Sequence, residues 1–461
     1  MGILSLRGEK MNWNFRPKFA YLLSITLLLS LSACQTDLIE DRSPWDIALD
    51  DAIEDALGIY GKQSLTMPSG IRLDEIPQDP KNPLTEEKIA LGRELYHETG
   101  MGTQAKKTEG MYTYSCASCH HSGAGFQSGK QQAIGDGGIG FGLKGEARSK
   151  NPNYDIDDLD VQPIRTPSAM NGAFQELMLW NGQFGATGMN AGTEDRWTKD
   201  SPKETNELGY HGLETQAIAG LKVHRMEVNK DFVDGMHYKK YFDIAFADIS
   251  EDDRYTRENA GLAIAAYERT LLANEAPFQR WLRGDRDAMT TTQKRGAALF
   301  FGKGNCASCH KGPALNEMEF YALGMEDLNG IGIYGGVDSD TEKGRGGFTG
   351  KSEDMYKFKV PQLYNLKDSP FYGHGGTFRT IKEVIQYKNE AKAAQSNVPA
   401  GQLADEFVPL GLTDEEINAL TAFLQNGLYD PDLERYLPAS LPSGLCFPNN
   451  DERSRREMGC N

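Results

Sequence analysis

The chain has 461 residues, of which 39% are hydrophobic and 25% charged, a composition typical of a soluble globular protein with a buried core. This length predicts two or three domains. The formal net charge of −17 argues against a nucleic acid as partner, because the phosphates would be repelled rather than neutralised. We expect the acidic surface mainly to keep the protein soluble, although it would also attract a basic partner protein.

The N-terminal segment has the pattern of an export signal. Basic side chains occur within residues 7–18, and an apolar run follows at 19–31 that is too short to span a membrane comfortably. The run ends in Leu-Ser-Ala-Cys at residues 31–34, which resembles the cleavage site of a bacterial lipoprotein. We therefore expect residues 1–33 to be a signal peptide and Cys34 to carry a lipid. The alternative is an ordinary signal that is cleaved without lipidation.

These features predict an exported protein on the periplasmic side of a membrane or elsewhere in the cell envelope, anchored through the lipid on Cys34. After Cys34 no stretch of the sequence is long and apolar enough to cross a bilayer. The membrane association would therefore be an anchor rather than a span.

Two identical motifs carry the chemistry of the chain. The sequence Cys-Ala-Ser-Cys-His occurs at residues 116–120 and again at 306–310, and both copies fit the pattern for covalent attachment of haem c. Two thiols on one short turn can add across the two vinyl groups of a haem, and the adjacent histidine reaches the iron. A redox disulfide or half of a zinc site is the main alternative, but neither requires a histidine directly after the second cysteine. The predicted attachment residues and iron ligands are Cys116, Cys119, His120, Cys306, Cys309 and His310.

The two remaining cysteines lie in a C-terminal tail that is rich in proline, asparagine and arginine. In an oxidising compartment, Cys446 and Cys460 are expected to form one disulfide that ties down residues 431–461.

Helical patterns precede both motifs. Thr85 can cap a helix that carries Glu86 and Glu87 in its first turn, where carboxylates suit the positive end of the helix dipole. Residues 91–96 lead towards the first motif much as residues 293–301 lead into the second. The same local arrangement therefore occurs twice.

Each half is also expected to end in a helix. One helix is predicted at about residues 258–273. The other begins at Thr413, which can form a capping box with Glu416, and Leu420 and Leu424 fall on one face.

Together these patterns predict a mainly α protein with two cytochrome c-like haem domains and long irregular loops. We place the N-terminal haem domain at residues 81–285 and the C-terminal one at 286–430, with the tail beyond. Residues 34–80 read as a tether that contains one short helix at about 45–57.

Further runs of residues surround the motifs in a fixed order. They are LGRELY (91–96), RTPSAMN (165–171), LWNG (179–182), YERTL (267–271), PF (277–278) and FKVPQLYNL (358–366). With these runs, the chain from about residue 82 to residue 425 resembles the bacterial diheme cytochrome c peroxidase family, including its MauG-type relatives. Their order is far more specific than the haem motif alone.

The resemblance implies a role for each matched residue. His120 would be the proximal ligand of the peroxidatic haem, and His310 that of the electron-accepting haem. Trp180 would lie between the haems as an electron relay, the alternative being a buried aromatic anchor. Glu227 falls near the position of the family's distal glutamate, where a carboxylate could pass a proton between the peroxide oxygens. The match is off by one residue, so Met226 is the alternative occupant of that position.

The sixth ligand of the second haem departs from the usual peroxidase pattern. Residues 380–387 match the segment that normally supplies a methionine, but they contain none, and Tyr387 is the available ligand, as in MauG-type enzymes. Met325 and Met355 are alternatives from neighbouring loops. A packed aromatic without a ligand role is the other reading of Tyr387.

A second departure concerns the first haem. No histidine occurs between Ser122 and Trp180, where members that need reductive activation carry a distal histidine. We therefore expect an open, five-coordinate iron that is ready for peroxide. His374 matches a family histidine near the second haem that is not assigned as a ligand. The other histidines, His97, His211, His224 and His237, have no assigned role, and we expect most of them at the surface.

Taken with the resemblance, the sequence predicts a cytochrome-c peroxidase that carries two covalently bound haems. Its substrate would be hydrogen peroxide and its electron donor a small c-type cytochrome or a similar protein. The resemblance also implies a calcium ion between the domains, with Asn171 and Ser369 at matching positions, and it leaves a homodimer open. The alternatives are a MauG-type oxidase that modifies a protein substrate and a diheme cytochrome that only transfers electrons.

Overall fold

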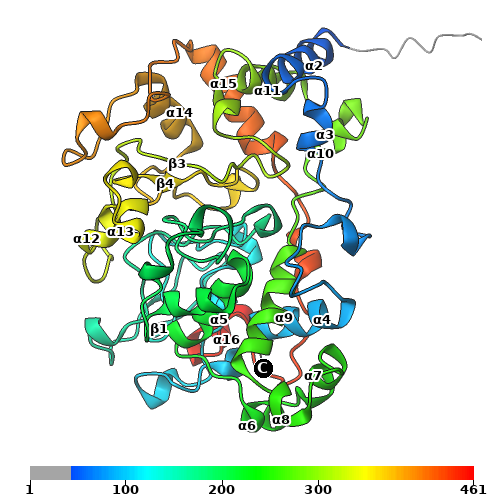
Figure 1. Cartoon of the computed structure of the whole chain (residues 1–461), viewed down its shortest axis with the longest axis vertical. Coiled ribbons are helices and arrows are strands. Elements are labelled where there is room, and N and C mark those ends of the chain that lie inside the picture. The colour runs from blue at the N-terminus through cyan, green and yellow to red at the C-terminus, as the bar shows by residue number, and fades with distance from the viewer. Residues whose placement is uncertain (1–42, 461) are drawn as a thin grey trace, which may run out of the picture. The chain divides into compact units, whose positions relative to one another are not determined.

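The computed structural model describes residues 43–460, and the predicted signal peptide and Cys34 lie outside these residues. From Trp45 onwards the chain forms one compact unit, and helices and irregular loops dominate it (Figure 1). The fold is therefore mainly helical, as predicted, whereas the division into haem domains at residues 285 and 286 stays a prediction. Among residues 43–460 no helix is long and apolar enough to cross a membrane.

The first group of helices surrounds α9 (Arg257–Arg269). Both α4 (Glu86–His97) and α5 (Gly212–Val223) pack on α9, and α4 and α9 lie side by side (Figure 1). Gly92 allows this close approach, because a Cβ at this position would lie 1.8 Å from the backbone oxygen of Ala263. The predicted cap is confirmed, since the Thr85 side chain accepts a hydrogen bond from the backbone N–H of Lys88 at 3.2 Å. Short helices complete this group: α6 (Lys230–Gly235), α7 (Lys239–Ala245) and α8 (Glu251–Arg254).

The second group is built in the same way around α11 (Thr291–Phe301) and α15 (Asp414–Ala422), which pack together. A Cβ on Gly296 would lie 2.0 Å from the backbone oxygen of Ala419, so glycine is again required where two helices cross. The predicted capping box of Thr413 and Glu416 is present. The remaining helices of this part of the chain are α10 (Pro277–Leu282), α12 (Ser339–Glu342), α13 (Arg345–Thr349) and α14 (Ile381–Glu390).

The segment predicted as a tether packs against the core over its described part. It contains α2 (Pro44–Leu57) and α3 (Gly61–Leu65), and Leu49, Ile53 and Leu65 are buried in the main hydrophobic cluster. The indole N–H of Trp281 on α10 donates to Asp46 at 2.7 Å. The short helix at 45–57 is confirmed, but these residues belong to the folded unit.

Helix α9 ends four residues earlier than predicted, and the reason is a competing set of hydrogen bonds. The backbone N–H of Asn171 donates to the oxygen of Leu271 at 2.7 Å, and the N–H of Ala273 donates to the Asn171 side chain at 3.0 Å. The chain after α9 therefore pairs with Asn171 instead of continuing the helix.

Regular strands are few and short in the described residues. β1 (Gly138–Ile139) pairs antiparallel with β2 (Ser149–Lys150), and β3 (Phe320–Tyr321) pairs antiparallel with β4 (Phe358–Lys359). In the registers, Gly138 lies opposite Lys150 and Phe320 opposite Lys359. Long irregular connections of this kind were predicted, and they carry the residues that surround the motifs.

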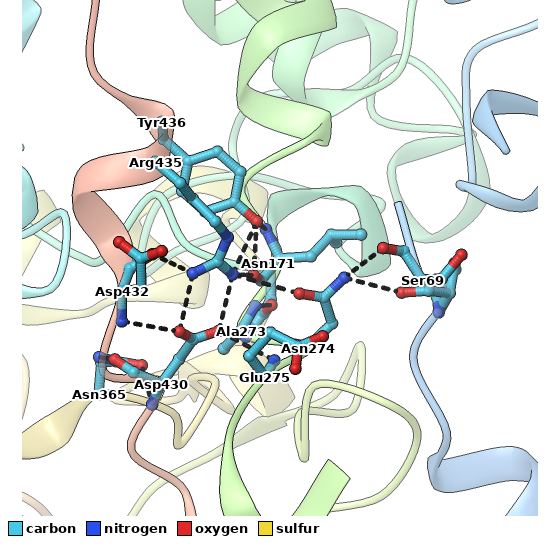
Figure 2. Close-up of polar contacts among 12 residues, drawn as sticks. Ser69, Asn171, Ala273, Asn274, Glu275, Asn365, Asp430, Asp432, Arg435 and Tyr436 are labelled. Carbon is cyan, nitrogen blue, oxygen red and sulfur yellow. Dashed lines mark hydrogen bonds and ion pairs between the residues drawn. The ribbon is translucent and has the colours of Figure 1, made fainter. Parts of the chain in front are cut away.

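A buried polar cluster joins segments from across the chain (Figure 2). Asp430 is fully buried and forms an ion pair with Arg435, at 2.7 Å between Oδ2 and Nη2. Asp430 Oδ2 also accepts the N–H of Glu275, and the amide of Asn365 donates to the Asp430 backbone oxygen. Asp430 and Asn365 are buried, so these hydrogen bonds join the segment after α9, the segment at Asn365 and the C-terminal region in a largely desolvated place.

The C-terminal tail ends in α16 (Glu452–Met458), and a disulfide joins Cys446 to Cys460, as predicted.

Candidate active site

The two motifs adopt the same local structure. Each begins with one turn of 3₁₀ helix, at Cys116–Ser118 and Cys306–Ser308. In each, the histidine N–H donates to the oxygen of the first cysteine, at 3.0 Å for His120 and 2.9 Å for His310. The four thiols of these motifs are half-buried and none is in a disulfide. The turn thus holds two thiols and an imidazole on one short segment, as attachment of haem c requires.

Both histidine rings are prepared to bind a metal. Nδ1 of His120 lies 3.3 Å from the backbone oxygen of Phe126, and Nδ1 of His310 lies 2.8 Å from that of Leu315. A carbonyl oxygen only accepts hydrogen bonds, so Nδ1 carries the proton and Nε2 keeps its lone pair for the iron. Burial lowers the pKa of each ring to about 4, which keeps both rings neutral.

The second motif opens into a large cavity of about 500 Å³. Cys306, Cys309 and His310 line it, and apolar side chains from several elements form most of the remaining wall. These side chains are Phe300, Val360, Leu363, Ile385, Leu420 and Leu424. A cavity of this size and character, with thiols and an imidazole at its wall, fits a haem group. The residues of the second motif would therefore hold the haem.

Trp180 lies in the wall of this cavity, on the side that leads to the first motif. Its indole N–H donates to the backbone oxygen of Arg165 at 2.8 Å. The Arg165 side chain is buried and donates to Gln127 and to the backbone oxygen of Lys130, in the loop that follows the first motif. Hydrogen bonds thus connect Trp180 through Arg165 to the loop that follows the first motif, and the predicted role of Trp180 as an electron relay stays a prediction.

A buried hydroxyl and a buried carboxyl belong to the surroundings of the first motif. The Tyr96 hydroxyl donates to the backbone oxygen of His120 at 2.8 Å. The carboxyl of Glu268 lies near enough for its charge to affect Cys116, and burial, assisted by Glu214, raises the pKa of Glu268 to about 8. Glu268 lies inside the matched run at 267–271, which was its only signal in the sequence.

A histidine and a carboxylate also belong to the surroundings of the first motif. Nδ1 of His224 lies 2.9 Å from Oδ2 of Asp160, and Asp160 is buried. The charge of His224 contributes to the low pKa of His120, while Asp160 contributes to the raised pKa of Cys119. The sequence analysis assigned no role to His224, and nothing in the sequence separation of 64 residues indicates its partner.

The C-terminal tail covers the first motif. The hydroxyls of Ser115 and Ser118 both donate to the backbone oxygen of Pro448, at 2.9 and 3.0 Å. The Thr99 hydroxyl donates to the oxygen of Cys446. The disulfide of this tail was predicted from the sequence, but the contact of the tail with the first motif was not.

Glu227 lies at the surface of the first helix group. Its carboxylate accepts a hydrogen bond from the side chain of Gln104 at 2.7 Å, and this pair is exposed. The neighbouring Met226 is buried in the main hydrophobic cluster. The predicted catalytic role of Glu227 stays a prediction.

The three candidates for the sixth ligand of the second haem differ in position. Tyr387 is not among the described residues that line the cavity, and its hydroxyl donates to the backbone oxygen of Leu323 at 2.5 Å. Met325 does line the cavity. Met355 lies elsewhere, against the backbone of Gly346. If Tyr387 is the ligand, the hydrogen bond from its hydroxyl to the backbone oxygen of Leu323 must break.

Of the four histidines without an assigned role, most were expected at the surface, but only His237 is exposed, while His211 and His224 are partly buried. His97 is buried, where its ring contacts the rings of Tyr96, Tyr267 and Phe447.

His374, which was not assigned as a ligand, is buried and stacks on Phe358. Its Nε2 pairs with Asp327 at 3.1 Å. The predicted lack of a ligand role for this histidine stays a prediction.

The side chains named for a calcium ion have other partners in this structure, and the calcium ion stays a prediction. The side-chain oxygen of Asn171 accepts the N–H of Ala273 (Figure 2), and the Ser369 hydroxyl accepts from the Arg165 guanidinium. A cation at Ser369 would face the positive charge of Arg165. Within residues 43–460 no group of histidine, cysteine and acidic side chains could hold a metal ion.

Comparisons with known proteins agree with the two motifs. Residues 86–287 match the di-haem cytochrome c peroxidase family. Cytochrome-c peroxidase IdrP1 of Denitromonas iodatirespirans is 28% identical over 375 residues, which cover 77% of this chain and 84% of that protein. The methylamine utilization protein MauG of Methylorubrum extorquens is 28% identical over 362 residues, covering 78% and 83% respectively.

Among solved structures, a MauG-like protein associated with microbial copper homeostasis has the same fold, with a TM-score of 0.52 and 23% identity over 79% of this chain and 95% of that one. The relatives thus include both peroxidases and MauG, which indicates an oxidoreductase with two haem c groups. The chain is thus similar to di-haem cytochrome c peroxidases and to MauG, and the match to the family model covers residues 86–287.

Proposed function

We propose that this protein is a di-haem cytochrome c peroxidase, which reduces hydrogen peroxide to water with electrons from a small c-type cytochrome. One observation supports the proposal: the chain has two haem-attachment motifs, and in each the histidine has its Nδ1 held by a backbone oxygen. Peroxide reduction needs one site that binds the peroxide and another that collects electrons, and two haem sites could divide these tasks.

Each part of the chain has a separate task in this proposal. His120 holds the haem at which peroxide reacts, and His310 holds the haem that receives electrons from the donor. The haem groups supply the redox chemistry when bound. Hydrogen peroxide, two protons and two electrons give two molecules of water, so the donor must deliver two electrons in succession. In this proposal Trp180, which lines the cavity beside the second motif, relays them between the sites.

The cellular setting is part of the same proposal. Export with a lipid on Cys34 would keep the protein in the cell envelope, where small c-type cytochromes donate electrons. The acidic charge of the chain, −17 in total, would attract a basic donor at low ionic strength. Association with such a donor should therefore weaken as salt is added.

A MauG-type oxidase is the second candidate function. It is favoured by the match of residues 380–387 to the segment that supplies the sixth ligand, which puts Tyr387 at that position. Such an enzyme would modify a residue on a partner protein and would turn over peroxide slowly with a cytochrome donor.

Steady-state turnover of the holoprotein tests the proposal. With reduced cytochrome c as donor, hydrogen peroxide should be consumed in a ratio of one peroxide to two cytochromes oxidised. Turnover should fall as ionic strength rises. No oxidation of the donor, both in the oxidised protein and after one-electron reduction, would rule out the peroxidase. A peroxide-induced spectral change without donor turnover would favour the MauG-type function.

A further inference from the structure

One lysine in the wall of the second cavity has no polar partner in the polypeptide. The lysine and arginine side chains that line this cavity are Arg165, Lys303, Lys359 and Lys388. Lys303 forms an ion pair with Glu416 at 2.6 Å, and Lys359 and Arg165 donate to backbone oxygens. The amine of Lys388, by contrast, forms no hydrogen bond or ion pair with residues 43–460. An amine enclosed in an apolar wall without a partner is costly, so a partner is expected inside the cavity.

Lys388 belongs to the face of α14 that forms part of the cavity wall. Ile381, Val384 and Ile385 line the cavity, and Lys388 continues their spacing of three and four residues along the helix. Tyr387 lies off this face and is not among the described residues of the wall. Helix α14 therefore presents an amine to the cavity at the position next to the tyrosine that the resemblance indicated.

The charge of Lys388 acts on the groups that would hold the second haem. Burial raises the pKa of the Cys306 thiol to about 12, and the charge of Lys388 opposes this rise. Burial lowers the pKa of His310 to about 4, and the same charge adds to the fall. Burial also lowers the pKa of Lys388, while Cys309, Cys306 and Glu406 act in the opposite direction. Because such interactions weaken with distance, the amine lies close to the thiols and the imidazole of the second motif.

This position favours the iron over the haem propionates as the partner of the amine. In haem c, the thiols attach at one edge of the ring and the two propionates project from the opposite edge. An amine that lies close to both thiols and to His310 is therefore on the side away from the propionates. An uncharged lysine amine has a lone pair that can bind iron, and enclosure by apolar side chains favours the uncharged form.

We infer that Lys388 is the sixth ligand of the second haem, with His310 as the fifth. The amine gives its proton to water, and Nζ donates its lone pair to the iron. This inference rests on the presence of two haem c groups and not on the reaction with peroxide. Two nitrogen ligands would keep the iron low-spin and leave no open position, which suits a haem that only transfers electrons. A methionine ligand would raise the reduction potential, so an amine in its place should leave the potential lower.

Met325 is the other candidate ligand in the cavity wall. Its sulfur lies near Gly373, where an added Cβ would be 3.3 Å from Sδ. A thioether is apolar and can be buried without a hydrogen-bond partner, whereas the amine of Lys388 cannot be buried in this way without cost. The iron would satisfy the group that needs a partner.

Near-infrared magnetic circular dichroism of the oxidised holoprotein tests the assignment directly. Low-spin irons with histidine–amine, histidine–methionine and histidine–tyrosinate ligation differ in their charge-transfer bands. We expect the band of histidine–amine ligation from the second haem. A methionine or tyrosinate band would overturn the assignment.

Lys388→Arg separates a ligand from a simple positive charge. A guanidinium keeps the charge but does not lose its proton, so it cannot bind the iron. The histidine–amine band should therefore be lost, whereas a lysine that only paired with a propionate would leave the band unchanged. Lys382→Arg on the same helix is the matched control and should keep the band, because Lys382 donates to Asn418 and does not line the cavity. The spectrum of the first haem is the internal control.

Lys388→Met replaces the amine with a thioether. This variant should show a methionine-to-iron charge-transfer band, and the reduction potential of the second haem should rise in a spectroelectrochemical titration. The result remains decisive even if Lys388→Arg binds the second haem poorly. A wild-type band and potential in Lys388→Met would contradict the assignment.

The outcomes separate this inference from the proposed function. If the bands change as predicted but the holoprotein does not oxidise reduced cytochrome c with peroxide, Lys388 is the ligand and the peroxidase proposal fails. If peroxide turnover is present but the wild type has a methionine or tyrosinate band, the peroxidase proposal stands and the assignment of Lys388 is wrong.

Discussion

The two haem-attachment motifs have the same five residues and the same local turn, yet their surroundings differ. The second motif opens into an apolar cavity of about 500 Å³. The first is covered by the disulfide-bonded tail and lies near the ion pair of His224 and Asp160. Because the motifs are identical, any difference in chemistry must come from the residues around them. An apolar wall suits electron transfer, while buried titratable groups suit a reaction that moves protons.

The largest effect on activity is expected when the two cysteines of one motif are replaced, because that motif then loses its haem. These variants test the comparison of the two sites most strongly. Cys116→Ser with Cys119→Ser should remove the first haem and abolish the reaction with peroxide. Cys306→Ser with Cys309→Ser should remove the second haem and abolish donor turnover, while peroxide still changes the spectrum of the first. Haem content per chain and stopped-flow absorbance check both variants. The division of tasks would be wrong if the second variant lost the peroxide reaction and the first kept it.

Opening the tail tests whether it supports the first site alone. The Cys446–Cys460 bond closes a short loop, so Cys446→Ser with Cys460→Ser should cost about 2–4 kcal/mol of stability, measured by denaturant unfolding. The spectrum of the first haem should change, because Pro448 would no longer hold Ser115 and Ser118. The spectrum of the second haem is the internal control. An equal change at both haems would contradict a local role for the tail.

Trp180→Phe should have a smaller effect. The indole N–H would no longer reach the backbone oxygen of Arg165, and electron transfer between the sites should slow while the initial peroxide reaction keeps its rate. Rapid mixing with peroxide, followed at both Soret bands, separates these two steps. If donor turnover were unchanged, Trp180 would be only an aromatic anchor in the cavity wall.

The smallest effect is expected at the two other candidates for the sixth ligand of the second haem. With Lys388 as the ligand, Tyr387→Phe and Met325→Leu should both leave the low-spin spectrum of this haem unchanged. The peroxide reaction at the first site should persist in both variants. A change in Tyr387→Phe alone would assign the ligand to Tyr387, as the resemblance implies. A change in Met325→Leu alone would assign it to Met325, which lines the cavity.

Local features of the fold could be predicted from the sequence, because they depend on residues that are close together in the chain. The caps at Thr85 and Thr413, the helix at 45–57 and the Cys446–Cys460 bond were all predicted. The end of α9 was not, since a distant residue, Asn171, takes the hydrogen bonds that would have extended the helix.

The candidate site was predictable only in part, for the same reason. The haem motifs are contiguous and can be recognised in the sequence. The pair of His224 and Asp160 joins residues 64 positions apart, and the contact of the tail with Ser115 joins residues 333 positions apart. The resemblance also could not show that the Arg165 guanidinium donates to the Ser369 hydroxyl. The motifs can be recognised in the sequence, but the residues that surround them come from distant parts of the chain and are brought together only by the fold.

The central claim is that the first site holds an open haem at which peroxide reacts, while the second transfers electrons. Electron paramagnetic resonance of the oxidised holoprotein, before and after one equivalent of hydrogen peroxide, tests it most directly. We predict a high-spin ferric signal that disappears when peroxide is added. Two low-spin signals that peroxide leaves unchanged, both in the oxidised protein and after one-electron reduction, would contradict the account.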